Sequence, residues 1–235
     1  MKFLLTSGGV KNPTIQRALV DLLGKPIAAS SALCIPTGVY AIPGGPAHAW
    51  KFFAGETGSP MCELGWQSVG VLELTALPSI DEKQWAPMVE ETDVLLVNGG
   101  DPLYLCHWMR QSGLADLLPA FRGVYVGMSA GSMIMAPTIG ERFVRWRPAS
   151  GSEETLGLVD FAMFPHLDHP MLPNNTMAAA EEWAANLAAN LAANLAVPRY
   201  AIDDETAIRV VNGDIEVVSE GNWRLFTPRR LDSPR

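Results

Sequence analysis

The amino-acid sequence predicts an α/β fold, with a mostly parallel sheet, helices on both faces and an antiparallel C-terminal hairpin at the edge. Apolar, strand-like runs alternate with segments of helical periodicity, as they do in βαβ units. The strand candidates are apolar along their whole length, which is typical of parallel strands covered on both faces. Near the C-terminus, Asn212 and Gly213 separate two strand candidates, and this dipeptide favours a tight antiparallel hairpin.

The first part of the chain alternates between strand and helix candidates. Gly24, Lys25 and Pro26 end the first helix, because glycine and proline both interrupt helical structure. Residues 36–46 are rich in glycine and proline and therefore predict a loop. We expect strands at residues 2–6, 27–35, 68–75 and 93–98, and helices at residues 14–23, 48–55 and 80–91.

The second part continues the alternation and ends in an unusual helix. Residues 103–118 predict a helix interrupted at Gly113, and residues 123–128 predict the next strand. A long helix is expected from about residue 174, and its end is the repeat NLAANLAANLA at residues 186–196. Because the unit has four residues, the asparagines and the leucines form neighbouring stripes on the helix. The leucine stripe is expected to pack on the body of the protein, or alternatively to form the surface of a homodimer.

Length and composition limit the classes of protein that remain. The chain has 235 residues, 48% of them hydrophobic, which predicts one domain over residues 1–235 with residues 228–235 as a loose tail. A net charge of −8 argues against a nucleic-acid partner, because nothing offsets phosphate repulsion. No apolar run reaches the length of a membrane helix, so no membrane contact is expected. Cys34, Cys62 and Cys106 show no disulfide or zinc spacing, and the sequence therefore predicts a cytoplasmic protein.

The stretch GMSAG, at residues 127–131, follows a strand candidate and precedes an apolar run with helical character. It fits the pattern G-x-S-x-G, in which a tight corner between strand and helix exposes the serine hydroxyl. Gly127 and Gly131 are expected where strand and helix approach each other closely. Ser129 is therefore the candidate nucleophile, and the N–H of Ala130 is expected to point at a developing oxyanion. The alternative is an ordinary glycine-rich turn with an incidental serine.

A second glycine-rich turn and two histidines extend the candidate site. The turn follows the strand candidate at residues 93–98, and the N–H groups of Gly100 and Asp101 are expected to complete an oxyanion hole. His166 follows an apolar, strand-like stretch and is the candidate general base. His169 lies three positions further along, so a metal pair is an alternative. With no third ligand in view, we expect neither a metal nor a cofactor.

The sequence resembles peptidase E (aspartyl dipeptidase) and its cyanophycinase relatives. The resemblance is carried by the glycine turns, by GMSAGSMIMAPTI at residues 127–139 and by the pair Pro165-His166, and it extends from residue 4 to residue 213. It implies a serine peptidase on a flavodoxin-like sheet of the class I glutamine amidotransferase type. It implies that Ser129 is the nucleophile and His166 is the base. It also implies that Gly100, Asp101 and Ala130 surround the oxyanion.

Three residues are candidates for the acid that orients the histidine. In the resembled dipeptidases an aspartate follows the serine after a short interval, and that position falls near Val144 here. Glu141 lies in the same segment and is the first candidate for the third member of a triad. Asp160 and Asp168 are its rivals.

Three arginines, Arg142, Arg145 and Arg147, lie close together downstream of the serine in an otherwise acidic protein. An arginine side chain binds a carboxylate through two parallel hydrogen bonds. We therefore expect substrates with a negative charge near the scissile bond, read by one of these arginines. The alternative is a solvated basic loop.

Taken with the resemblance, these residues predict a cytoplasmic serine peptidase of the dipeptidase type that acts on short peptides. Two alternatives remain open. The first is a binding protein that keeps the fold without turnover, which a misplaced acid would favour. The second is an esterase or amidase that uses the same serine.

Overall fold

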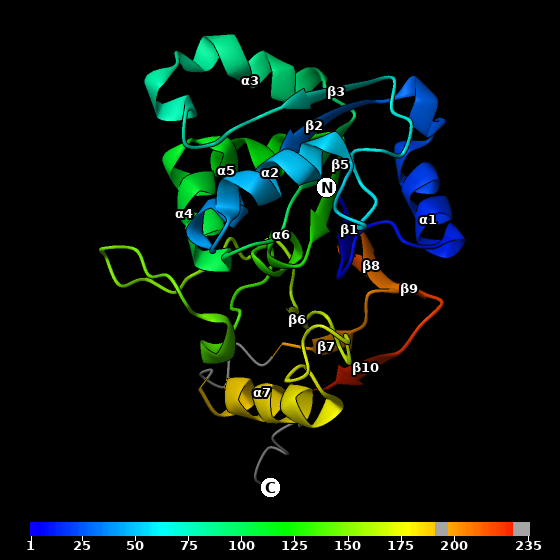
Figure 1. Ribbon diagram of the computed structural model, residues 1–235, viewed down its shortest axis with the longest axis vertical. Helices are drawn as coiled ribbons and strands as arrows, with labels where there is room; N and C mark the ends of the chain where they lie inside the picture. The colour runs from blue at the N-terminus through cyan, green and yellow to red at the C-terminus, as the bar shows by residue number, and fades with distance from the viewer. Residues whose placement is uncertain (191–196, 228–235) are drawn as a thin grey trace, which may run out of the picture.

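The computed structural model describes residues 1–190 and 197–227 (Figure 1). Its centre is a seven-stranded sheet with the strand order β3-β2-β4-β5-β1-β8-β9. The strands from β3 to β1 are parallel to one another, and β8 and β9 are antiparallel to their neighbours. The seven strands are β1 (Lys2–Thr6), β2 (Ser31–Ile35), β3 (Ser68–Val71), β4 (Val94–Val97), β5 (Val124–Met128), β8 (Thr206–Val211) and β9 (Asp214–Ser219). The predicted fold class is therefore confirmed.

The C-terminal hairpin of this sheet forms at the predicted turn. Asn212 and Gly213 connect β8 to β9, and both have positive φ angles, 51° and 94°. This is the conformation that a two-residue type I′ turn requires, and it matches the twist of the strands. β9 is the edge strand, so the hairpin lies at the edge of the sheet as expected.

Helices cover both faces of the sheet, and each face has its own core. On one face, α1 and α2 bury Ile15, Leu19 and Phe52 against the strands. On the other face, α3 and α4 bury Trp85 and Met109. Figure 1 shows α1 and α4 on opposite sides of the strands. The helices are α1 (Pro13–Leu23), α2 (Gly45–Ala54), α3 (Glu82–Glu91), α4 (Pro102–Gln111), α5 (Leu114–Leu117) and α6 (Ala130–Met133). Among the described helices, none is long and apolar enough to cross a membrane.

Several element boundaries differ from the sequence prediction. Residues Ile27–Ala29 form a 3₁₀ turn, and β2 begins only at Ser31, where it begins to pair with β3; its pairing with β4 begins at Ala32. β3 ends at Val71 because the chain then turns toward the loop after β2, where the N–H of Leu74 donates to the Thr37 hydroxyl. The helix predicted over residues 103–118 breaks at Gly113, which has φ 82°, as expected.

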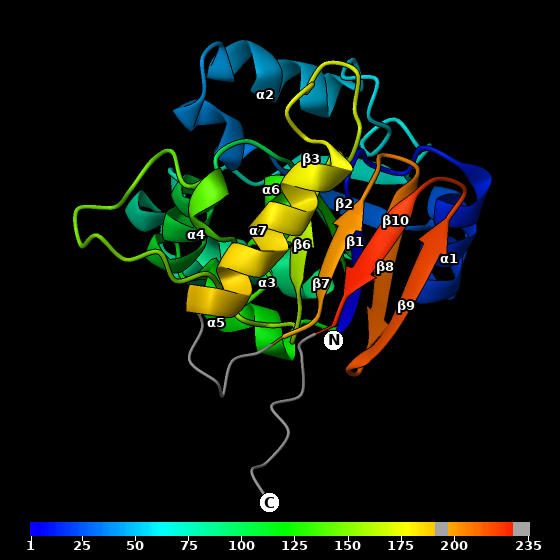
Figure 2. The ribbon, with the colours of Figure 1, turned by 90° about the horizontal axis from the view of Figure 1, so that it is seen from below.

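A second, three-stranded sheet was not predicted from the sequence. Its order is β10-β7-β6, from β6 (Ala162–Phe164), β7 (Arg199–Ile202) and β10 (Trp223–Phe226). β6 and β7 are parallel, and β10 is antiparallel to β7. Helix α7 (Met177–Asn190) lies beside β6 and β7 of this sheet (Figure 2) and contributes Trp183 and Leu187 to a third core that includes Phe164 and Ala201.

The alanine-rich helix was expected from about residue 174, and it begins at Met177. Within its repeat, Leu187 is buried and Asn186 is exposed, so this first leucine packs on the body of the protein. The later repeat units at residues 191–196 and the expected tail at residues 228–235 lie outside the described residues.

Candidate active site

Ser129 occupies a sharp corner between β5 and α6. Its φ and ψ angles are 52° and −115°, a conformation that residues other than glycine rarely adopt. The backbone N–H of Ser129 donates a hydrogen bond of 3.0 Å to the carbonyl of Thr6, at the end of the neighbouring strand β1. Strained conformations of this kind persist only where the surrounding structure holds them, and they gather at functional sites.

The two glycines that flank this corner are required by close contacts of the backbone. A Cβ atom on Gly127 would lie 2.7 Å from the backbone of Gly131. A Cβ atom on Gly131 would lie 2.4 Å from the carbonyl oxygen of Val97 in β4. The close approach of strand and turn, which the sequence pattern predicted, is therefore present.

His166 connects Ser129 to a carboxylate. Its Nε2 atom lies 2.8 Å from the Ser129 hydroxyl oxygen, and its Nδ1 atom lies 2.7 Å from Oδ1 of Asp204. Neutral imidazole offers one donor and one acceptor nitrogen, so Nδ1 can donate to the carboxylate while Nε2 accepts from the serine hydroxyl. His169 lies on the outer side of the same carboxylate, with Nε2 3.5 Å from Oδ2 of Asp204.

Asp204 reaches His166 because β6 and β7 run side by side in the same direction. Phe164 pairs with Ala201, so the residues that follow the two strands emerge at one edge of the sheet. The Asp204 side chain is only 14% exposed. Burial alone would raise the pKa of this carboxyl. The hydrogen bond from His166, assisted by the Ser7 hydroxyl and the Lys11 charge, outweighs that effect and lowers the pKa to about 2.

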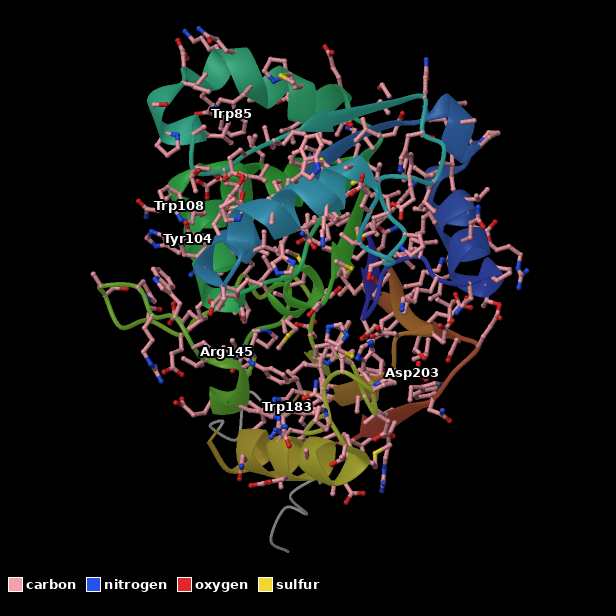
Figure 3. All side chains as sticks on the ribbon, in the orientation of Figure 1. Trp85, Tyr104, Trp108, Arg145, Trp183 and Asp203 are labelled. Atoms are coloured by element: carbon pink, nitrogen blue, oxygen red, sulfur yellow. The ribbon has the colours of Figure 1, made fainter. Side chains whose placement is uncertain are left out.

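The sequence reasoning missed Asp204, although the chain carries a signal for it. Asp203 and Asp204 directly follow the buried strand β7, as His166 follows β6. Asp203, labelled in Figure 3, plays a different part, because its carboxylate accepts hydrogen bonds from Glu205, Thr206 and Asn222 and closes the turn. Recognising Asp204 required knowing that β6 and β7 are neighbours.

The prediction that Glu141 is the third member of the triad is wrong. Glu141 begins the short 3₁₀ helix η5 (Glu141–Phe143), its side chain is 69% exposed, and its carboxylate binds Arg147 at 2.8 Å. The two rivals do not replace it. Asp160 precedes β6, at the opposite end of that strand from His166, and Asp168 is exposed with its own N–H bonded to the carbonyl of Asn175.

The three N–H groups expected near an oxyanion differ in whether they already have a hydrogen-bond partner. Within residues 1–190 and 197–227, the N–H groups of Gly100 and Ala130 donate no hydrogen bond. The turn that carries Gly100 lies against the serine, since a Cβ atom on Gly99 would be 3.1 Å from the Ser129 Cβ. The expectation for Asp101 is wrong, because its N–H donates a 2.9 Å hydrogen bond to the carbonyl of Gly38.

Asp101 instead organises the loops around the site. Its side chain is 2% exposed, and its Oδ1 accepts from the N–H of Tyr104 at the start of α4. Its Oδ2 accepts from the N–H of Trp146 at 3.0 Å, so it ties the loop after η5 to α4. Tyr104 and Trp146 then meet edge to face, with ring centroids 5.3 Å apart.

The three arginines separate in the structure. Arg147 forms ion pairs with Glu141 and Glu153. Arg142 donates to the carbonyl of Asn174 and lies over the ring of Phe164. Arg145, labelled in Figure 3, is exposed just after η5. Two of the three are therefore engaged with other groups of the protein.

The described part of the chain contains no cluster of three or more His, Cys, Asp or Glu side chains suited to a metal ion. His166 and His169 share a carboxylate, and the ring centroids of the two histidines lie 6.0 Å apart. The arrangement of Ser129, His166 and Asp204 suits the transfer of a proton from the serine hydroxyl to the histidine, with the carboxylate orienting the imidazole.

Comparisons with known proteins found one family model and similar solved structures. The family model of peptidase family S51 matches residues 3–218. A candidate peptidase E protein from Listeria monocytogenes EGD-e has a similar structure, with a TM-score of 0.64, 17% identity, and coverage of 94% of this chain and 98% of that one. A peptidase from an acI-B1 Actinobacterium has a TM-score of 0.66, 20% identity, and coverage of 97% and 94%. No curated protein matches the sequence.

Proposed function

This chain belongs to peptidase family S51, and we propose that it is a serine peptidase of the peptidase E type that hydrolyses short peptides. The observation that carries the proposal is the continuous line of hydrogen bonds from Ser129 through His166 to Asp204, at 2.8 Å and 2.7 Å. A serine beside a histidine that a carboxylate orients is the arrangement that activates a hydroxyl for acyl transfer.

In the proposed reaction, the Ser129 hydroxyl attacks the carbonyl carbon of the scissile peptide bond while His166 Nε2 takes its proton. The tetrahedral intermediate collapses when the imidazolium gives that proton to the leaving amine, and an acyl-enzyme ester remains. Water then attacks the ester carbonyl carbon and loses a proton to His166. When the second tetrahedral intermediate collapses, the imidazolium gives that proton to the leaving Ser129 oxygen, which restores the hydroxyl and releases the carboxylic acid. Asp204 holds the imidazole in the tautomer with a proton on Nδ1 and stabilises the imidazolium.

The N–H groups of Gly100 and Ala130 are the proposed donors to the oxyanion. Support comes from their position on the two turns that meet at Ser129 and from their lack of partners among the described residues. Preorganised backbone donors stabilise the charge that develops on the carbonyl oxygen and are worth on the order of 10²–10³ in kcat. All of these steps use groups of the protein itself, so the proposed mechanism includes no cofactor.

The proposed substrate is a short peptide with a negative charge near the scissile bond. Of the three arginines expected to read this charge, Arg145 is our candidate, because Arg147 is paired with two glutamates. We also propose that the protein acts in the cytoplasm, a compartment that suits its free thiols at Cys34, Cys62 and Cys106.

A dipeptide library tests the proposal, with the wild-type protein and Ser129→Ala assayed in parallel. We expect hydrolysis by the wild type and a loss on the order of 10⁶ in kcat for the variant. Simple esters and amides, assayed beside the peptides, test the alternative substrate classes. A wild-type protein that binds peptides without releasing amines would favour the alternative of a binding protein, and a Ser129→Ala protein that keeps a tenth of the activity would exclude Ser129 as the nucleophile.

A further inference from the structure

The turn Ser7-Gly8-Gly9 follows β1 and lies directly beside the candidate site. β1 and β5 are parallel with Thr6 opposite Met128, so Ser7 lies level with Ser129 on the neighbouring strand. Ser7 is fully buried, with 0% of its surface exposed. None of the proposed chemical steps uses this serine.

The Ser7 hydroxyl contacts two parts of the site at once. It donates a 2.8 Å hydrogen bond to Oδ1 of Asp204, the same oxygen that binds His166 Nδ1. It also accepts a 2.6 Å hydrogen bond from the backbone N–H of His166. His166 has a φ angle of 58°, which is costly for a residue with a side chain, so this hydrogen bond supports a strained backbone.

The other oxygen of Asp204 is held much less firmly. Asp204 lines a pocket of about 310 Å³, and the side-chain nitrogens Lys11 Nζ and His169 Nε2 lie 3.6 Å and 3.5 Å from its Oδ2 atom. These distances are too long for strong hydrogen bonds. Among the described residues, His166 and Ser7 are the groups that donate hydrogen bonds to the Asp204 side chain. The rotation of the carboxylate therefore depends on Ser7.

The glycine after Ser7 makes room for this contact. A Cβ atom on Gly8 would lie 2.6 Å from Cγ of Asp204, so any larger residue would push the carboxyl group away. Gly9 adopts φ 91°, and its N–H donates to the Thr6 hydroxyl at 3.0 Å, which closes the turn. The whole turn is thus shaped around Asp204.

We propose that Ser7 is a positioning residue of this site: its hydroxyl sets the orientation of the Asp204 carboxylate and holds the backbone of His166. The inference rests on the proposed function, because it takes Ser129, His166 and Asp204 as the reacting groups. Ser7 acts through the other two residues and does not touch the substrate. Its removal should reduce the rate of the chemical step and leave substrate binding unchanged.

The experiment compares Ser7→Ala and Ser7→Thr with Ser30→Ala as the matched control. Ser30 is also 0% exposed, and its hydroxyl donates to the Pro26 carbonyl at the far end of β2. We expect kcat to fall about 10- to 100-fold in Ser7→Ala, the loss for one hydrogen bond to a charged group, with KM unchanged. Ser7→Thr keeps the hydroxyl and should retain most of the activity, and Ser30→Ala should keep the wild-type kcat.

The pH profile separates positioning from a structural role. Without the Ser7 hydrogen bond, the negative charge of the Asp204 carboxylate is compensated by one donor fewer. The carboxylate should then stabilise the protonated form of His166 more strongly. Activity in Ser7→Ala should therefore be lost at a higher pH than in the wild type, on the acidic side of the profile. A Ser7→Ala protein with the wild-type kcat and pH profile would overturn the proposal.

Two further measurements test the role of Ser7 if Ser7→Thr does not fold or if peptides are not the substrate. If Ser7→Thr does not fold, Ser7→Ala is combined with Asp204→Asn. The carboxylate that Ser7 orients is then absent, so Ser7→Ala should lower kcat by less than it does in the wild type, and losses that simply add would contradict the inference. The rate of labelling of Ser129 by a fluorophosphonate reports its reactivity without any peptide. If peptides are not hydrolysed but labelling is slower in Ser7→Ala than in the wild type, the substrate assignment fails and the role of Ser7 stands. Equal labelling rates would refute that role.

Discussion

The Nδ1 atom of His166 lies 2.7 Å from Oδ1 of Asp204, and the two residues follow neighbouring parallel strands of the second sheet. Because both strands end at the same edge, the contact needs no long loop to bring the side chains together. The serine comes from the other sheet, at the end of β5. The candidate site therefore lies where the two sheets meet, and its geometry depends on how they pack.

Replacing the acid tests the assignment directly. Asp204→Asn should lower kcat on the order of 10⁴-fold, because the amide can favour the wrong tautomer of His166. Glu141→Gln is the control and should keep the wild-type rate, because Glu141 binds an exposed arginine instead of His166. Steady-state kinetics on a peptide that the wild type cleaves measures both, with circular dichroism to verify folding. A large loss in Glu141→Gln alone would return the role of the acid to that residue.

The stability of the protein should depend on Asp204 at low pH. Its pKa is about 2 in the folded protein, below the ordinary value of 3.8. A carboxyl with a lowered pKa stabilises the fold above the ordinary value, and this stabilisation is lost as the pH falls toward the lower one. The contribution is about 2 kcal/mol. Urea unfolding of the wild type and Asp204→Asn across this range should show a difference between them that shrinks as the pH falls; a constant difference would contradict the prediction.

Arg145 should influence which peptides are cleaved. If it binds a carboxylate of the substrate, Arg145→Ala should raise KM for a dipeptide with an N-terminal aspartate by more than for one with an N-terminal alanine. The removal of a charged hydrogen bond is worth about 1.5–3 kcal/mol, or roughly 10- to 100-fold. Arg147→Ala is the control, because Arg147 already pairs with Glu141 and Glu153. If Arg145→Ala changes KM equally for both peptides, Arg145 does not bind the substrate carboxylate and is a solvated side chain.

The alanine-rich helix offers a matched pair of neighbours for a stability test. Leu187 is 4% exposed and packs in the core between α7 and the second sheet, whereas Asn186 is exposed. Leu187→Ala should reduce the free energy of unfolding by about 2–5 kcal/mol through the cavity that it leaves. Asn186→Ala should be neutral or slightly stabilising, because alanine is the better helix former. Urea denaturation measures both, and similar values for the two variants would show that the leucine is not a core residue.

The sequence alone determined the features that depend on residues close together in the chain. The turn Asn212-Gly213 requires positive φ angles that these residues tolerate, so the hairpin could be recognised. Gly127 and Gly131 frame Ser129 because strand and turn collide with any side chain there, and that constraint is also local. The alternation of apolar strands and helices then predicts the central sheet, since each face must be covered.

Only the tertiary structure decided which carboxylate contacts His166 and which backbone N–H groups beside Ser129 already have a hydrogen-bond partner. Asp204 lies 38 positions after His166, and the second sheet that joins them consists of short strands with little pattern of their own. Glu141, although nearer in sequence to Ser129, points to an arginine in solvent. The N–H of Asp101 is taken by the carbonyl of Gly38, a residue of another loop. Strand pairing and hydrogen-bond partners over such separations arise from packing of the whole chain, and the spacing of residues in the sequence does not encode them.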